Sequence, residues 1–309
     1  MARYVGQRLL QMIPVFFGAT LLIYALVFAM PGDPIQAMGG ERGLPIAMAN
    51  RIRAEYHLDQ PFFVQYWYYI KGVFTLDLGM SFQRRPVFDI IAQVYPTTAK
   101  LAVYALAIEG ILGVAVGLIS GIRRGGIFDT SFLAVSLVVI SIPTFVIGFV
   151  LQYFIGLKAG ILPATATGGA SWRALTLPAI TLGSVSFAYV LRLTRTSVIE
   201  TQTADFVRTA MAKGVTRRKV VTGHILRNSL IPVVTFLGGD LGALMGGAIV
   251  TEGVFHVNGI GHTLYRAITR GEPTTVVSIV TVLVIVIMIA NLLVDLLYAA
   301  LDPRIRYAK

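Results

Sequence analysis

"DFVRTAMAKGVTRRKVVTGHILRN", residues 205–228, is a basic stretch that separates two long apolar segments. Its apolar residues form two groups with helical spacing, at 206–211 and at 220–226. Gly214 lies between the groups, at a place where a residue that tolerates a positive φ angle ends a helix at little cost. Thr216 can cap the second helix. The stretch therefore predicts two short helices joined by a turn at Gly214.

The segments on both sides of this stretch are long enough to cross a lipid bilayer. The chain of 309 residues is 56% hydrophobic and 13% charged, with a mean hydropathy of +0.75, far from the average of soluble proteins. Crossing the hydrocarbon core takes about 20 apolar residues. We therefore expect an all-α membrane protein with six transmembrane helices, at 9–29, 101–122, 131–157, 175–191, 229–250 and 274–294.

Lysine and arginine are distributed unequally about these segments. If the N-terminus lies inside, 15 of the 26 basic residues fall on the cytoplasmic side, as the positive-inside rule requires. We therefore expect both termini in the cytoplasm, together with residues 205–228. The net charge of +11 is explained by this topology and by contact with anionic lipid, without a nucleic-acid partner.

The chain divides into three expected parts. Residues 1–30 form the first span, which we interpret as uncleaved, and residues 31–100 form a long extracytoplasmic loop. Residues 101–309 form a core of five spans, interrupted by the loop at 197–228. The long loop holds a candidate helix, "AMANRIRAEYH" at 47–57, and an aromatic cluster at 62–69. Such a cluster favours an amphipathic helix at the membrane interface.

The sequence contains no motif for a catalytic or metal centre. There is no cysteine, and the Gly-Lys pair of a phosphate-binding loop is missing. No nucleophile-elbow or zinc-protease motif is present. Two histidines lie in "HVNGIGH", and this spacing of His256 and His262 is more typical of surface polar residues than of metal ligands. We expect a transport role, no enzyme activity and no cofactor in this chain.

Four polar residues inside the predicted spans are candidate functional sites, because charge within a bilayer is costly. Each could contact a substrate, or be paired between helices or near a membrane surface, and the sequence favours pairing. Three glycines, Gly238, Gly242 and Gly246, have the small-xxx-small spacing of a helix-packing face, within the chain or against a partner. The four polar candidates are Glu109, Asp240, Asn291 and Asp295.

The basic stretch itself has two interpretations. It can be a membrane-surface loop that obeys the positive-inside rule, or a docking element for a cytoplasmic partner. Arg217, Arg218 and Lys219 fall in the first turn of the second predicted helix, where cations oppose the helix dipole. Their favourable partners must therefore be acidic lipid headgroups or an acidic protein surface.

Motifs along nearly the whole chain resemble one known family. "RTAMAKG" at 208–214 resembles the E-A-A-x-x-x-G loop of bacterial ABC-importer permeases, in the form found in the dipeptide, oligopeptide and nickel group. Of this motif, Ala210 and Gly214 match, whereas Arg208 and Thr209 replace Glu and Ala. The long first loop resembles that of the first of the two permease subunits. Other stretches are similar to further signatures of this family: "PGDP" at 31–34, "LDQPFFVQY" at 58–66, "DLGMS" at 77–81, "HILRNSLIPVVT" at 224–235 and "NLLVDLLYAALDPRIR" at 291–306.

The resemblance implies a permease subunit in a bacterial cell membrane that forms half of a translocation pathway for dipeptides or oligopeptides. The implied partners are a second homologous permease, cytoplasmic ATPase subunits that bind ATP and Mg²⁺, and an extracytoplasmic substrate-binding protein. Contact with the ATPase is implied for Arg208, Thr209, Ala210, Lys213, Gly214, Thr216, Arg217 and Arg218.

Alternatives remain for the cargo and for the class of transporter. Relatives in the same family carry nickel chelates, glutathione or haem. A stand-alone, ion-coupled secondary transporter would instead use Glu109 and Asp240 as proton or cation sites, although the sequence lacks the internal repeat typical of that class.

Overall fold

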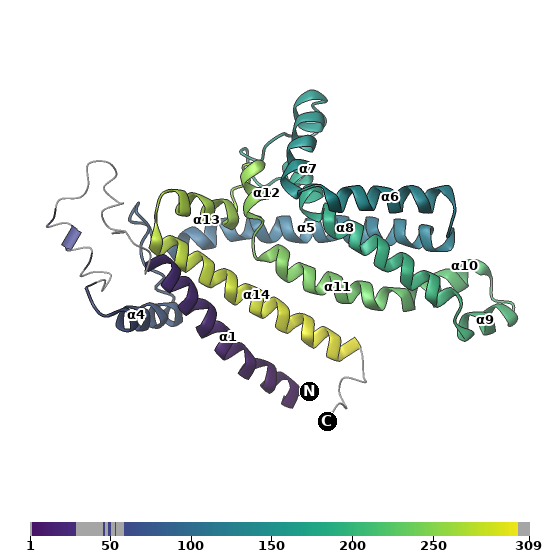
Figure 1. The fold of residues 1–309 in the computed structure, drawn as a ribbon, viewed down its shortest axis with the longest axis horizontal. Helices are drawn as coiled ribbons and strands as arrows, with labels where there is room; N and C mark the ends of the chain where they lie inside the picture. Colours follow the sequence, from purple (N-terminus) through teal and green to yellow (C-terminus); the bar gives the residue numbers. More distant parts are fainter. Residues whose placement is uncertain (1, 29–45, 47–48, 51–52, 54–58, 302–309) are drawn as a thin grey trace.

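The computed structural model describes residues 2–28, 46, 49–50, 53 and 59–301 (Figure 1). Most of the helix expected at 47–57 and all of the "PGDP" motif lie outside these residues. Within the described part of the chain the elements are helices and turns, with an isolated bridge between Met80 and Pro86. The expected all-helical class is therefore confirmed.

Five helices are long and apolar enough to cross a membrane, and a bent pair of helices is a sixth candidate. Each of the five begins before the apolar segment predicted for it, and the fourth ends at Met245 and not at residue 250. The five are α1 (Ala2–Phe28), α5 (Val87–Ile122), α8 (Trp172–Gln202), the continuous helix Arg217–Met245, and α14 (Pro273–Leu301). The fourth of them is made of α10 (Arg217–Lys219), η3 (Val220–Leu226) and α11 (Arg227–Met245).

The segment expected as the third span, 131–157, is the bent pair. It consists of α6 (Ile127–Ser141), followed by α7 (Thr144–Leu151) and η2 (Gln152–Lys158), with a bend of 106° between the two arms. Pro143 lacks a backbone N–H and disfavours a helical conformation at Ile142, which is extended with φ −95° and ψ 129°. The direction of α7 in Figure 1 follows from this break.

The closest helix packing joins α5 to α8. Three glycines of α5 face α8: an added Cβ at Gly113 would lie 2.6 Å from the Val190 side chain, and one at Gly121 would lie 2.6 Å from Val198. At Gly117 it would lie 2.5 Å from the backbone oxygen of Leu191. Small residues at this spacing let two membrane helices approach closely. This stripe was not among the sequence predictions.

The glycine face that the sequence does predict packs α11 against α14. An added Cβ at Gly238 would lie 3.2 Å from Val294, and one at Gly246 would lie 3.0 Å from Ile287. Of the two predicted uses of this glycine face, packing within the chain or against a partner, the structure shows packing within the chain. On its other side α14 lies beside α1 (Figure 1), whose outward side chains are largely exposed apolar residues, as expected of a lipid-facing helix.

The aromatic cluster forms α4 (Phe62–Thr75), an amphipathic helix. Its inner rings pack on Tyr24 of α1, and the Tyr69 hydroxyl is hydrogen-bonded to Thr281 of α14. Phe63 and Trp67, on the outer side, are largely exposed. This division of apolar rings suits the interfacial position predicted from the sequence.

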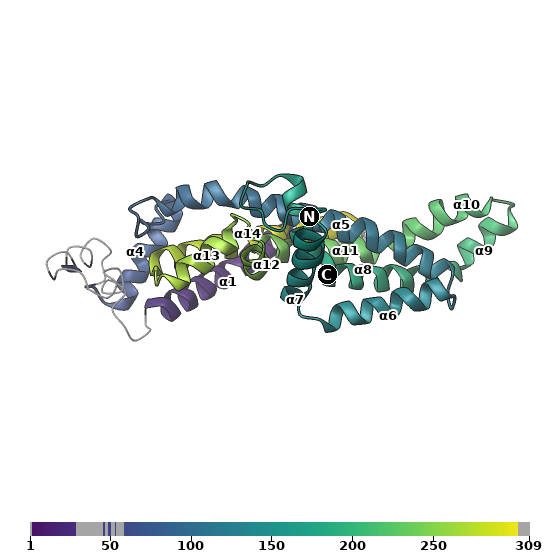
Figure 2. The same cartoon turned by 90° about the horizontal axis from the view of Figure 1, so that it is seen from above.

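The remaining short helices lie near the two ends of the molecule and in its middle. Figure 2 shows α9 (Asp205–Ala212) and α10 together at one end, beyond α5 and α8. Towards the opposite end lie α4 and α13 (Ile260–Thr269), while α12 (Ile249–Val254) lies between. The long helices thus separate two surfaces, one formed by α9 and α10 and the other by α13 and the start of α5.

Candidate functional site

The turn between α9 and α10 is centred on Gly214, which has a φ of +77°. The Gly214 N–H donates to the Met211 carbonyl at 2.9 Å, and the Val215 N–H donates to the Ala210 carbonyl at 3.2 Å. These two bonds are those of a Schellman motif, in which the residue after the helix cap adopts a left-handed conformation. The structure therefore has the first helix and the glycine turn that the sequence predicts, but the second helix is not a short one: it is the beginning of the continuous helix Arg217–Met245.

An apolar cluster attaches α9 to the ends of the long helices. Val207 and Ala210 of α9 are buried against η3 and α8, and side chains from the end of α5 complete the cluster. Because the side chains interdigitate, α9 cannot shift without displacing the helices that it touches. The buried members are Val198, Val207, Ala210, Val220 and Ile225, and Leu118, Ile122, Val215 and Val221 pack around them.

The opposite face of the turn presents basic and apolar groups to the surroundings. Phe206 and Met211 are about half exposed, and Met211 lines a cavity of about 420 Å³ bordered by α9 and η3. Arg208 lies 3.8 Å from Asp205 in an exposed pair that contributes little to stability. Of the predicted contact residues Ala210 is buried, whereas the exposed ones are Arg208, Thr209, Lys213, Gly214, Thr216, Arg217 and Arg218.

Thr216 corrects one detail of the sequence prediction. Its φ of −60° and ψ of 143° place it at the N-cap position of α10, but its side chain makes no capping hydrogen bond. The backbone alone closes the turn, since the Val220 N–H donates to the Thr216 carbonyl at 3.0 Å. The turn geometry therefore depends on Gly214 and not on a threonine cap.

A buried ion pair that the sequence analysis missed lies near the same end of the molecule. The Arg195 guanidinium on α8 donates to both oxygens of Asp129, at 2.5 Å and 2.8 Å, and the Gly125 N–H donates to the same carboxylate at 2.8 Å. The Asp129 side chain is 2% exposed and that of Arg195 is 20% exposed. A forked pair of this kind fixes geometry as well as distance, so it holds the start of α6 on α8.

The polar candidates near the end of α14 are paired with other helices. Asp295 forms an ion pair with Arg8 of α1, with 3.2 Å between Arg8 Nε and Asp295 Oδ2. Asn291, one turn earlier, reaches the α11 glycine face, where its Oδ1 would lie 3.3 Å from a Cβ added at Gly242. These two residues therefore join α14 to its neighbours on both sides.

Glu109 and Asp240, treated separately in the sequence, are brought together by α5 and α11. Glu109 is fully buried, and its Oε2 would lie 3.0 Å from a Cβ added at Gly183 of α8. Within the described residues, neither oxygen of Glu109 has a hydrogen-bond partner of ordinary geometry. Three helices thus meet at a buried carboxyl group in the middle of the protein.

Glu252 is a further buried acid, which the sequence analysis did not single out. It accepts hydrogen bonds from the Thr98 hydroxyl at 2.7 Å and from the His262 N–H at 2.9 Å, while Thr98 in turn accepts from the Ile260 N–H at 2.8 Å. Burial raises the pKa of the Glu252 carboxyl, although these donors lower it. The network fastens α12 and the start of α13 to α5. An isolated acid between apolar residues, in "IVTEGVF", was the available signal.

The sequence matches two family descriptions that together cover almost all of it. Residues 113–307 match the binding-protein-dependent transport system inner membrane component, and residues 1–102 match the N-terminal region of such membrane components. The chain belongs to this family. It is therefore a multi-pass component of a binding-protein-dependent transport system, and the predicted family resemblance is confirmed.

Individual relatives in the family can be aligned with this permease over its full length or nearly so. The dipeptide transport system permease protein DppB of Escherichia coli strain K12 is 36% identical over an alignment of 339 residues that covers 100% of both chains. The glutathione transport system permease protein GsiC of the same strain is 36% identical over 308 residues, which covers 99% of this chain and 100% of GsiC.

The Asp129–Arg195 pair yields a first test of how the α9–α10 end of the permease is built. We expect Asp129→Ala to lower the free energy of unfolding by about 2 kcal/mol, between the values for exposed and buried pairs, because Arg195 loses its partner. Thermal unfolding of the purified protein in detergent measures the change. Asp205→Ala is the control, since that carboxylate is exposed, and it should leave the Tm unchanged. Equal Tm values for both variants would contradict the role assigned to the pair.

Proposed function

We propose that this chain is one of two homologous permease subunits of an ATP-driven importer of dipeptides or oligopeptides. The observation that carries the proposal is the α9–Gly214–α10 turn, which packs by its inner face on α5, α8 and η3 and presents basic groups on its outer face. Such a structure suits a contact through which an ATPase moves the permease helices. The full-length relation to a dipeptide permease supports the peptide cargo.

In the proposed arrangement both termini and the α9–α10 turn lie in the cytoplasm, and α13 with the start of α5 lies outside. The distribution of lysine and arginine supports this orientation. ATP binding and hydrolysis on the partner displace α9 and α10 as a unit, and the apolar cluster carries the displacement into α5 and α8. The pathway between the two permeases then changes from outward to inward access. Contacts with the peptide backbone would let one pathway accept varied side chains.

The test is uptake by the complete complex in proteoliposomes. Both permeases, the ATPase subunits and the binding protein are reconstituted, and accumulation of a labelled dipeptide is measured with and without ATP on the α9 side. We expect accumulation only when ATP and the binding protein are both present. Uptake by this chain alone, driven by an ion gradient, would replace the proposal with the secondary-transporter alternative and would point to Glu109 and Asp240.

The same assay separates the two cargo classes that the relatives suggest. A glutathione permease is as similar to this chain as a dipeptide permease, with 36% identity in each case. Labelled dipeptide and labelled glutathione are therefore compared at equal concentrations. We expect faster uptake of the dipeptide, and faster uptake of glutathione would assign the complex to the second class.

A further inference from the structure

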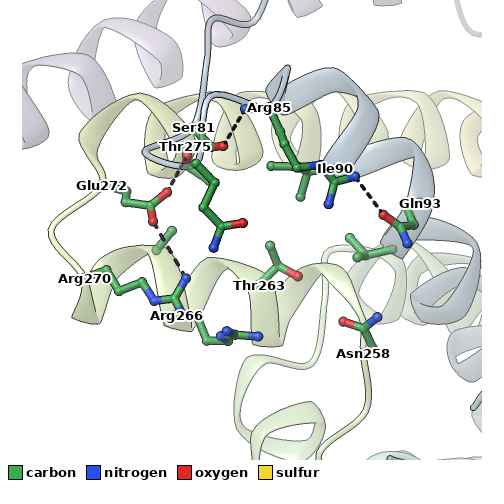
Figure 3. Close-up of a pocket in the computed structure, with 13 residues that line it drawn as sticks. Ser81, Arg85, Ile90, Gln93, Asn258, Thr263, Arg266, Arg270, Glu272 and Thr275 are labelled. Carbon is green, nitrogen blue, oxygen red and sulfur yellow. Dashed lines mark hydrogen bonds and ion pairs between the residues drawn. The ribbon is translucent and has the colours of Figure 1, made fainter. Parts of the chain in front are cut away.

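A pocket of about 230 Å³ lies between α13, the start of α5 and the start of α14. Figure 3 shows its walls, which are rich in guanidinium, amide and hydroxyl groups. One wall is the tight turn before α5, where Arg84 has a φ of +56° and the Ser81 N–H donates to the Arg85 carbonyl at 2.9 Å. The pocket therefore has a defined shape on the side of the protein opposite to α9 and α10.

Three arginines converge on this pocket from two elements. Arg266 lies in α13, Arg270 is the residue that caps its C-terminal end four positions later, and Arg85 comes from the facing turn (Figure 3). Like charges at this helical spacing repel one another. The Arg85 guanidinium is held in place by a hydrogen bond of 3.2 Å to the Gln93 side chain, which is not an acid. The pocket therefore gathers positive charge from both of its walls.

One carboxylate offsets part of this charge. Glu272 is buried at the foot of the pocket, accepts a hydrogen bond from the Thr275 hydroxyl at 3.0 Å, and lies 3.9 Å from the Arg270 guanidinium. Three guanidinium groups thus face one acid among the lining residues. The pocket therefore has a surplus of positive charge. A second carboxylate would offset more of this charge, and it suits the site because a guanidinium fork matches a carboxylate in shape as well as charge.

The size of the pocket decides what can bring that carboxylate. Sites that enclose a whole small ligand are about 300–1,000 Å³, so this one is too small for a peptide of several residues. It suits a single acidic side chain on the surface of a larger molecule. The surrounding amide groups, those of Gln83 and Asn258 among them, add hydrogen-bonding capacity around such a side chain.

We propose that the Arg85, Arg266 and Arg270 pocket is a docking site for an acidic side chain of the extracytoplasmic substrate-binding protein. The inference rests on the proposed function, because it needs the proposed orientation and a binding protein that delivers cargo to this face. Glu272 lies 3.9 Å from Arg270, and Gln93 accepts a hydrogen bond from Arg85, so the acidic side chain meets a cluster of positive charge. Complementary charges favour specificity and fast association.

Charge reversal tests the site in the assembled complex. Binding of the purified, peptide-loaded binding protein is measured against the full complex in lipid nanodiscs, for wild type and for Arg266→Glu. We expect Arg266→Glu to weaken binding by about tenfold and to reduce its dependence on ionic strength. Lys158→Glu is the control: it likewise replaces a basic residue by glutamate, at an exposed position outside the pocket. It should leave the affinity within about twofold of wild type. Equal effects of the two variants would overturn the proposal.

Cross-linking gives a readout that does not depend on the stability of the charge-reversed variant. The natural sequence has no cysteine, so Arg266→Cys carries one unique label site for a photoreactive maleimide. We expect illumination to join position 266 to the binding protein, and the same label at Lys158→Cys to give no such product. Cross-links from position 266 to lipid or to labelled peptide, without the binding protein, would overturn the docking site.

The two proposals fail in distinguishable ways. If the wild-type complex shows no ATP-dependent uptake, the proposed function is wrong. If the wild-type complex takes up peptide but Arg266→Glu binds the binding protein like wild type, the function stands and the docking site is wrong.

Discussion

Replacement of Gly214 by valine is expected to reduce peptide uptake strongly while ATP hydrolysis and membrane insertion continue. Gly214 has a φ of +77°, with nothing within 4 Å of an added Cβ, so the obstacle is the backbone conformation and not a clash. This left-handed conformation costs a non-glycine residue about 2 kcal/mol of conformational free energy, and β-branched residues tolerate it least. That energy corresponds to roughly a thirtyfold depopulation of the native turn.

The consequence for coupling follows from the two hydrogen bonds that close the turn. Without a left-handed residue at position 214, the Val215 N–H no longer reaches the Ala210 carbonyl, and α9 leaves its fixed angle to α10. Under the proposed function, an ATPase that moves this turn would then no longer displace the long helices. The measurement is the ratio of peptide transported to ATP hydrolysed in proteoliposomes, which should fall by about tenfold or more.

Two further variants control this experiment. Gly160→Val places the same residue at a comparable φ, +61°, in a loop away from the turn, again with open space around an added Cβ. It should preserve coupling. Gly214→Asn should retain part of it, because asparagine tolerates the left-handed region. Normal uptake by Gly214→Val would remove the coupling role from this turn.

Replacement of Gly117 by leucine is expected to prevent α5 from packing on α8. The added Cβ would lie 2.5 Å from the Leu191 carbonyl oxygen and 2.7 Å from the Thr194 Cβ. The first of these is a backbone atom of a long helix and cannot rotate away. Overpacking of a core costs about 1–3 kcal/mol, and a clash with backbone should cost at least the upper value. We expect little folded protein, seen as loss of the monodisperse peak in size-exclusion chromatography.

Gly18→Leu is the matched control for this prediction. Gly18 is also a glycine of an apolar helix, α1, but an added Cβ there meets nothing within 4 Å. The same side chain should therefore be tolerated within the chain. If Gly117→Leu gives folded protein with the same Tm as Gly18→Leu, the close approach of α5 and α8 is not needed for stability.

The sequence predicts the features that depend on local chemistry. Apolar length identifies the helices that can span a membrane, and a glycine between two helical patterns identifies the turn at Gly214. The spacing of Gly238, Gly242 and Gly246 likewise indicates a packing face. Each of these signals is carried by residues close together in the chain, so one sequence is enough to read it.

Other features depend on which helices become neighbours. The sequence could not say that Asp295 pairs with Arg8, that Asp129 pairs with Arg195, or that Glu109 meets Asp240. Each of these pairs joins side chains from different helices, and only the packed structure sets their distances. The missed glycine stripe on α5 is a different case: Gly113, Gly117 and Gly121 have the same four-residue spacing as the predicted face, so the sequence did carry this signal. Only the identity of the partner helix, α8, depended on the structure.

The membrane class, the helical segments and the glycine turn were therefore determined by the sequence itself, because hydrophobic length and backbone preference act within a few turns of chain. The tertiary structure alone decided the 106° bend between α6 and α7–η2, the partners of the buried acids, and the meeting of three arginines at one pocket. Pro143 permits that bend, but the angle is set by packing. Contacts between distant residues depend on packing geometry, which no local pattern encodes.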